Sequence, residues 1–200
     1  IVETDKDFAH ARALIRWDDR YVATALTSMF RIVFAQAILP YDAVSLHASA
    51  VVSEGKAFLF MGKSGTGKST HSALWIRHIG DTELLNDDNP IVRVIDGKAV
   101  VYGSPWSGKT PCYRNVSAPV AAMVRLKQGP RNRFEPKEDI EAFRAVLPGC
   151  SVLRQDRRLH DALCMTLAAL IDSICVGELE CLPDKEAAEV CRKGILEEID

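Results

Sequence analysis

The feature that most constrains this chain is the sequence Gly-Lys-Ser-Gly-Thr-Gly-Lys-Ser at residues 62–69. It matches the pattern G-x-x-x-x-G-K-[ST], in which a glycine-rich backbone turns its N–H groups toward phosphate oxygens. The pattern alone also arises by chance. Here the apolar run 57–61 precedes it and a helical pattern over 69–79 follows it. Because a strand, the loop and a helix in this order are the context that confirms the motif, we expect a nucleotide- or phosphate-binding (Walker A) loop.

The residues of this loop have separable roles. Glycines let successive N–H groups point inward, Lys68 places a cation on the outer phosphates, and Ser69 offers a hydroxyl to Mg²⁺. The residues predicted to contact the nucleotide are Gly62, Ser64, Gly65, Thr66, Gly67, Lys68, Ser69 and Thr70.

Length and charge limit the classes of function. A chain of 200 residues is enough for one well-buried core, so we expect a single domain over residues 1–200. It does not begin with Met, which leaves room for a segment upstream of Ile1. With 25 basic and 27 acidic residues it has no basic footprint for nucleic acid or membrane. We therefore expect a cytoplasmic protein that binds neither, while assembly into a homo-oligomer stays open.

Six cysteines are spread over the chain without a C-x-x-C pair and without zinc-ligand spacing to a histidine. Such cysteines are typically reduced thiols that pack as small hydrophobic side chains. We expect no disulfide framework and no zinc site.

Periodicity before the loop predicts a helix and a hairpin. Residues 19–38 carry apolar side chains at helical spacing, and Pro40 ends the pattern. Residues 45–52 and 57–61 read as two strands joined by a tight turn. If residue 52 faces residue 57, the register places His47 opposite Gly62.

The remaining chain alternates between strand, loop and helix patterns. We expect strands at 82–88, 118–126 and 177–182, a hairpin over 91–102 with a type I′ turn at Asp96-Gly97, loops at 103–111 and 128–136 (the latter mobile), and helices at 137–147, at 156–176 and from Pro183-Asp184 onward. Four basic residues on the helices are expected to be solvated and without a role, namely His71, His78, Arg157 and Arg158.

Two carboxylates form the second part of the predicted site. Asp87 and Asp88 end the strand 82–88, where a carboxylate can hold Mg²⁺ or accept a proton. Neighbouring negative charges push pKa values apart, so the two can divide these tasks. Taken without the loop, an Asp-Asn turn would be the simpler interpretation. With the loop, we assign Asp88 to the metal and Asp87 to proton transfer.

His47 forms the third part. A histidine among small apolar residues is usually a satisfied strand or core residue. The predicted register places it against the phosphate loop, where it would hold a carboxylate in position or bind a metal as neutral imidazole. We interpret His47 as catalytic, together with Asp87 and Lys68, and expect it to steady Asp87.

The loop that follows residue 102 gives a weaker signal. Lys109 and Arg114 are candidates for substrate or phosphate binding, with Trp106 as a wall of the site. The alternative is a surface turn with Trp106 as its anchor, and the sequence leaves both open.

Residues 45–95 resemble the core of the ATP-dependent phosphoenolpyruvate carboxykinases and of the HPr kinase/phosphorylase catalytic domain. The stretch that carries the resemblance is LHASAVVSEGKAFLFMGKSGTGKSTHSALW followed by LLNDDNP. Both families have a histidine on the strand before the same loop and paired aspartates on a later strand. The resemblance implies an α/β P-loop kinase fold with a mixed sheet. It also implies nucleotide contacts at Gly65, Gly67, Lys68 and Ser69, metal roles for Ser69 and Asp88, and catalytic roles for His47 and Asp87.

The combined prediction is an ATP- and Mg²⁺-dependent phosphotransferase that acts on a hydroxyl of a protein, peptide or small molecule. One alternative is an enzyme of the carboxykinase type. Another is a regulatory module that binds nucleotide without chemistry. The sequence leaves open the acceptor and whether the donor is ATP, ADP or pyrophosphate.

Overall fold

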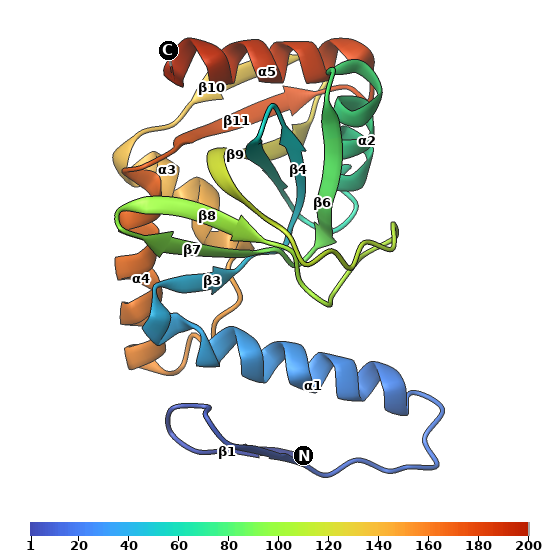
Figure 1. Ribbon diagram of the computed structural model, residues 1–200, viewed down its shortest axis with the longest axis vertical. Helices are drawn as coiled ribbons and strands as arrows, with labels where there is room; N and C mark the ends of the chain where they lie inside the picture. The colour runs from blue at the N-terminus through green and yellow to red at the C-terminus, as the bar shows by residue number, and fades with distance from the viewer. Residues whose placement is uncertain (200) are drawn as a thin grey trace.

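Strands from both halves of the chain assemble around the predicted phosphate loop. The computed structural model describes residues 1–199. The strands of the main sheet are β3 (Ala43–Ser45), β4 (Ala48–Ser53), β5 (Lys56–Met61), β6 (Thr82–Asp88), β7 (Ile91–Ile95), β8 (Lys98–Tyr102), β9 (Ser117–Gln128), β10 (Arg133–Pro136) and β11 (Cys175–Cys181). The main path runs β3-β7-β8-β9-β5-β4-β6, and β10 and β11 leave it at β9 (Figure 1).

The sheet is mixed and it curls at β9. This strand runs parallel to β5 and to β11, whereas the other pairs are antiparallel. β9 pairs with β8 through residues 117–119 and with β11 through residues 122–128. Besides its pairing with β5, β9 thus pairs first with β8 and then with β11. The sheet divides along this strand. The result is an α/β fold with a mixed sheet, which confirms this part of the sequence prediction.

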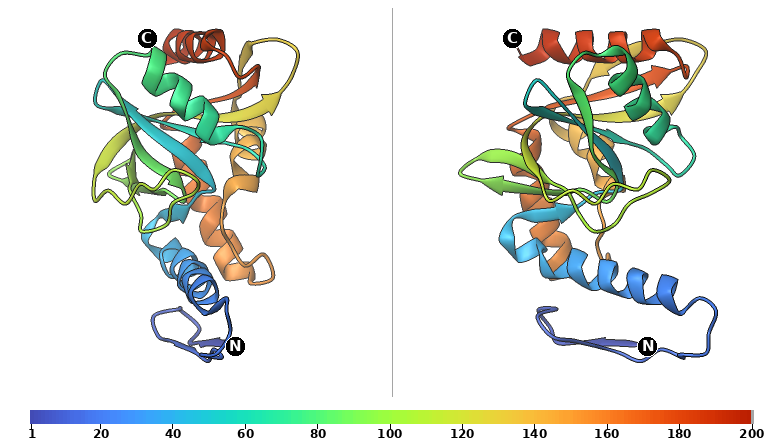
Figure 2. Two further views of the ribbon diagram at one scale, coloured as in Figure 1. Left: turned by 90° about the vertical axis from the view of Figure 1, so that its right-hand side faces the viewer. Right: turned by 45° about the vertical axis from the view of Figure 1, so that its right-hand side comes forward.

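Helices cover both faces of the sheet (Figure 2). They are α1 (Val22–Ala37), α2 (Lys68–His78), α3 (Asp139–Val146), α4 (Arg157–Ile171) and α5 (Lys185–Ile199), with 3-10 turns at Leu39–Tyr41 and Leu147–Gly149. Leu59 of β5 belongs to a core cluster shared with α3 and α4, whereas Phe58 and Phe60 belong to one shared with α2 and α5. The alternation along β5 follows from the period of two residues in a strand.

α1 and an amino-terminal hairpin lie at the end of the molecule opposite α5 (Figure 1). The hairpin pairs β1 (Val2–Thr4) with β2 (Ala11–Ala13), and its strand residues are exposed. In α1 only Ala35 and Gln36 are buried, while Phe30 and Ile32 remain exposed. This hairpin was not anticipated from the sequence.

Most predicted elements are confirmed, including the register of the first hairpin, but the strand predicted at 45–52 is interrupted, since β3 ends at Ser45 and β4 begins at Ala48. Val52 pairs with Ala57, and the ladder continues to Ala48 opposite Met61. The strand at 82–88 is present with the predicted bounds. Asp96 and Gly97 have φ of 50° and 72°, the left-handed conformation that a type I′ turn requires.

Two predictions about the second half are wrong in part. The segment 128–136 is not a loop throughout, because β10 pairs with β11 and Phe134 packs into the α5 side of the core. The helix predicted at 156–176 ends at Ile171, since Cys175 and Val176 pair with β9 instead. In both cases a strand partner distant in sequence overrides the local pattern.

Candidate phosphate-binding site

The loop after β5 has the backbone conformation of a phosphate cradle. Gly65 and Gly67 have φ of 83° and 108°, a region that only glycine enters readily. Thr66 donates from its N–H and from its hydroxyl to the carbonyl of Lys63, at 3.1 and 2.7 Å, which fixes the turn. α2 begins at Lys68, and no side chain caps its amino terminus. Its first N–H groups therefore face the loop, where they favour an anion.

His47 lies beside this loop, as the register predicts. The strand ladder ends at Ala48 and Met61, so His47 is the next residue outward and Gly62 its counterpart. The Lys68 ammonium is 2.9 Å from His47 Nε2 and donates to the Gly62 carbonyl at 3.1 Å. An ammonium can only donate, so Nε2 accepts and the ring proton is on Nδ1. Burial lowers the pKa of Lys68, an effect that the carboxylates of Asp88 and Asp87 oppose.

The other nitrogen of the His47 ring lies close to Asp88. Nδ1 of His47 is 3.1 Å from Asp88 Oδ1. The second oxygen of this carboxylate accepts from Asn89 Nδ2 at 2.6 Å and from Arg31 Nη1 at 3.3 Å. The hydrogen bond from His47 is the largest cause that holds the pKa of Asp88 below its usual range, against the effect of burial. Asp88, His47 and Lys68 thus form one connected chain of a carboxylate, an imidazole and an ammonium.

Asp87 has a different environment. It pairs with Ser49 across the sheet, and Ser49 is 2.7 Å from Ser72 of α2, so Asp87 lies on the α2 face of β6. Its side chain is buried and accepts from the Thr110 N–H at 3.1 Å. We expected His47 to steady Asp87, but the ring contacts Asp88. The reason is strand geometry, because adjacent residues of β6 point to opposite faces.

The loop after β8 folds over the end of β6. Asn86 is fully buried and its amide nitrogen donates to the Trp106 carbonyl at 3.0 Å, while its oxygen accepts from the N–H groups of Asp88 and Asn89. Gly108 donates its N–H to the Asp87 carbonyl. The Trp106 ring packs on Phe34 of α1 with centroids 5.3 Å apart. This loop is therefore anchored to β6 and to α1.

The two basic residues predicted to bind substrate or phosphate lie at different ends of β6. Lys109 is exposed between Gly108 and Thr110, whose backbones bond to Asp87, so its backbone lies beside the site. Arg114 is held at the other end of β6 by Glu83, at 3.0 Å, and by the Leu84 carbonyl. Glu83 and Asp87 are four residue steps apart along β6, roughly 13 Å. The structure does not bring Arg114 to the phosphate loop.

The remaining predicted residues border the loop. Ser64 and Thr70 are exposed, and Ser69 is half-buried in the first turn of α2. Among residues 1–199, no group of three or more His, Cys, Asp or Glu side chains is arranged to hold a metal ion. A Mg²⁺ ion bound through phosphate uses only one or two protein oxygens, and the Ser69 hydroxyl and the ionised Asp88 carboxylate are donors of the type that it takes.

Several residues of the site were missed by sequence reasoning. Arg31 and Asn89 donate to the Asp88 carboxylate, Asn86 accepts from the N–H groups of Asp88 and Asn89, and Gln128 donates to the phosphate loop. Asn86 and Asn89 lie within the stretch LLNDDNP but were given no role, and no motif marks Arg31 or Gln128. His71 was expected to be solvated. It is instead buried against the ring of Phe60, and this burial lowers its pKa to about 4. Helical spacing did not indicate which face of α2 turns inward.

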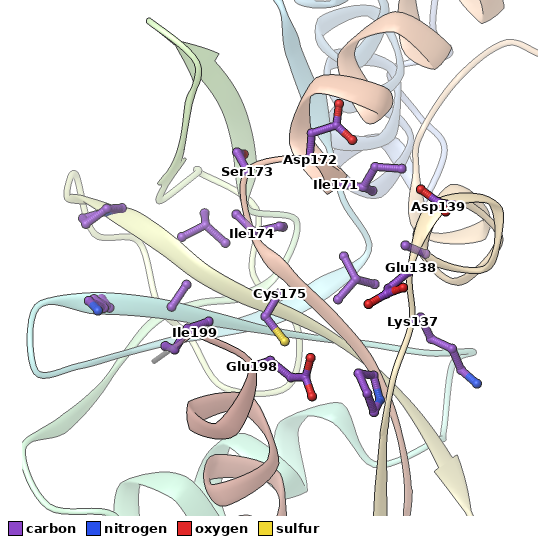
Figure 3. A pocket seen from close by; sticks show the side chains of 17 residues that line it. Lys137, Glu138, Asp139, Ile171, Asp172, Ser173, Ile174, Cys175, Glu198 and Ile199 are labelled. Carbon is purple, nitrogen blue, oxygen red and sulfur yellow. The ribbon is translucent and has the colours of Figure 1, made fainter.

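A cavity of about 640 Å³ lies away from the phosphate loop, at the end of β5 that begins with Lys56. Figure 3 shows the acidic side chains of Glu138, Asp139, Asp172 and Glu198 around it, with Cys175 between them. Burial raises the pKa of the Cys175 thiol to about 11, which makes it a poor nucleophile. This cavity contains none of the predicted site residues.

Comparisons with known proteins give a distant structural likeness only. No protein-family model matches the chain, and no curated protein matches it. Among solved structures, the HPr(Ser) kinase/phosphatase from Coxiella burnetii aligns with 78% of this chain and 99% of its own chain, at 12% identity and a TM-score of 0.44. None of the helices within residues 1–199 combines the length and the apolar character needed to cross a membrane.

Proposed function

We propose that this protein is an ATP-binding phosphotransferase that moves a phosphoryl group to a hydroxyl of a protein, peptide or small molecule. The observation that carries the proposal is the chain of Asp88, His47 and Lys68, with contacts of 3.1 and 2.9 Å, at the end of the phosphate loop. Phosphate binding alone requires the loop and its lysine. An imidazole and a carboxylate held behind that lysine favour a site that also performs chemistry.

The loop and α2 would hold the donor. The N–H groups of residues 65–69 surround the phosphates, and Lys68 leaves the Gly62 carbonyl to neutralise the outer ones. His47 acts as a positioning residue for Lys68 and Asp88. Ser69 and Asp88 would hold Mg²⁺, which when bound neutralises charge on the phosphate oxygens.

Asp87 is the proposed base. The acceptor oxygen forms a bond to the terminal phosphorus, the bond from phosphorus to the bridging oxygen breaks, and ADP leaves. The hydroxyl proton passes to Asp87. The loop around Thr110 covers this carboxylate, so the acceptor would enter beside that loop, near the exposed Lys109.

The experiment separates binding from transfer. Labelled phosphate is followed from ATP into fractionated lysate, and ATP binding is measured by calorimetry. We expect Lys68→Ala to abolish both, whereas Asp87→Asn keeps binding and lowers transfer by about 10²-fold or more. Lys98→Ala is the control, because Lys98 is an exposed residue of the β7–β8 hairpin.

Two outcomes contradict parts of the proposal. Full transfer by Asp87→Asn would remove Asp87 as the base. ATP binding with no labelled acceptor in any fraction would favour the regulatory module instead. ADP and pyrophosphate are tested as donors in the same assay.

A further inference from the structure

A cavity of about 330 Å³ adjoins the phosphate loop, and neither His47 nor Asp88 lines it. Its walls come from four parts of the chain. They are residues 65–67 of the loop, Thr70, His71 and Leu74 of α2, Gln128 at the end of β9, and residues 181–183 between β11 and α5. The cavity thus shares four residues with the predicted nucleotide contacts, namely Gly65, Thr66, Gly67 and Thr70.

The lining differs in chemistry from the other side of the loop. No Asp, Glu, Lys or Arg side chain of the described residues lines this cavity, and Leu74, Leu182 and Pro183 give it apolar walls. Its volume lies near the lower end of the range for small-molecule sites, about 300–1,000 Å³. A flat uncharged group fits this space, whereas a charged peptide would lose its hydration without compensation.

The walls are held in place without a ligand. Gln128 Nε2 donates to the carbonyls of Gly65 and Thr66, each at 3.4 Å, and so ties β9 to the loop. Asn132 accepts from the Leu182 N–H at 2.8 Å and donates to Asp184 at 3.0 Å. The cavity is therefore preformed.

His71 in the inner wall has a hydrogen-bonding group without a partner. Trp75 Nε1 donates to His71 Nε2 at 3.1 Å, which places the ring proton on Nδ1. Within residues 1–199, this buried Nδ1 makes no hydrogen bond. Native interiors rarely leave such a donor unpaired. Because Nδ1 is buried, a heterocycle with a ring nitrogen or carbonyl in the cavity would supply the acceptor once the His71 ring turns toward it.

We infer that this cavity binds the base and ribose of the phosphoryl donor, so that the donor is a nucleotide and not pyrophosphate. The inference rests on the proposed function, because it takes the phosphates of the same ligand to lie on the shared residues 65–67. His71 then acts as a specificity-determining residue for the base.

The test compares ATP with tripolyphosphate, which has the phosphates but no nucleoside, by calorimetry with Mg²⁺. We expect the wild-type protein to bind ATP at least about tenfold more tightly. Leu182→Trp places a larger ring at the rim of the cavity, and Leu182 is 38% exposed, so the fold tolerates the change. This variant should bind ATP no better than tripolyphosphate, with tripolyphosphate affinity unchanged.

Leu153→Trp is the matched control, because Leu153 is 39% exposed in a loop that does not line the cavity. It should keep the preference for ATP. A second variant, His71→Phe, should weaken ATP binding several-fold and leave tripolyphosphate binding as it is.

The outcomes distinguish this inference from the proposed function. Equal affinity of the wild-type protein for both ligands, or undiminished ATP binding by Leu182→Trp, overturns the nucleoside site while the phosphate loop stands. If the wild-type protein binds neither ligand, the proposed function fails and the inference fails with it.

Discussion

The His71 imidazole is enclosed by the aromatic rings of Phe60 and Trp75 in the core beneath α2. Burial lowers its pKa from 6.5 to about 4. Between these two pH values the unfolded chain binds a proton at this residue and the folded chain does not. The free energy of unfolding therefore decreases as the pH falls through this window.

A substitution at His71 tests this linkage. The pKa difference corresponds to about 3 kcal/mol of stability lost between neutral pH and pH 4, as an order of magnitude. His71→Phe removes the titrating group, so its unfolding free energy should decrease less over the same interval. Urea unfolding of the ligand-free proteins at several pH values measures both slopes. Parallel slopes would contradict the assignment, and the comparison at pH 8 isolates the packing effect.

The site residues show where sequence reasoning stops. The position of His47 beside the loop could be predicted, because a motif and one hairpin register place them together. Both aspartates were expected at the end of their strand, but the pairing of β6 with β4 that brings them to His47 was not predicted. The contact of Arg31 with Asp88 joins residues in different elements, and no local pattern encodes it. The pairing of His47 with Asp88 and not Asp87 depends on which face of β6 turns toward the loop.

At the scale of elements, α5 packs closely on the pair β10–β11 through one aromatic ring. The Phe134 ring occupies a slot between Gly177 of β11 and Gly194 of α5, and a Cβ atom at either glycine would overlap the ring. Glycine in a helix costs about 1 kcal/mol relative to alanine. Close packing against the Phe134 ring therefore explains why α5 has a glycine at position 194.

Gly194→Ala should destabilise the protein although it improves helix propensity. Overpacking costs about 1–3 kcal/mol, which outweighs the propensity gain. Urea unfolding should show a net loss of about 1 kcal/mol. Gly80→Ala is the control, because a Cβ at Gly80 meets open space. If Phe134→Leu does not relieve the loss in a double-mutant cycle, the ring is not its cause.

The same packing explains the partial failure at residues 128–136. Their polar composition favours a loop, whereas pairing with β11 makes Arg133–Pro136 a strand, and the glycines of β11 and α5 leave room for its Phe134 ring. Those glycines lie far along the sequence. A reading of local pattern cannot supply such a partner.

At the scale of the whole molecule, stability is concentrated in the layers around the sheet. The hairpin strands β1 and β2 are exposed, and the hairpin reaches α4 through ion pairs such as Arg158 with Asp7. Exposed pairs of this kind contribute about 0–1 kcal/mol. Phe8 adds a partly buried side chain to the core.

Deletion of residues 1–13 should therefore change the stability only slightly. We expect the free energy of unfolding, measured with urea, to decrease by on the order of 1 kcal/mol, with ATP affinity retained. A loss of the cooperative transition would show instead that the hairpin is an integral part of the core.

The order of the sheet also has a consequence for synthesis. Residues 47–88 contain the phosphate loop, His47 and both aspartates, whereas the wall at residues 181–183 joins only after β11 has paired with β9. Pairing between such distant segments is slow, since a long loop must close first. On the ribosome, a chain that has emerged only to residue 170 has the segment for the phosphates but lacks the wall for the base. Under the proposed assignment, such a nascent chain would contain the residues that bind phosphate before it contains the wall that selects a nucleoside.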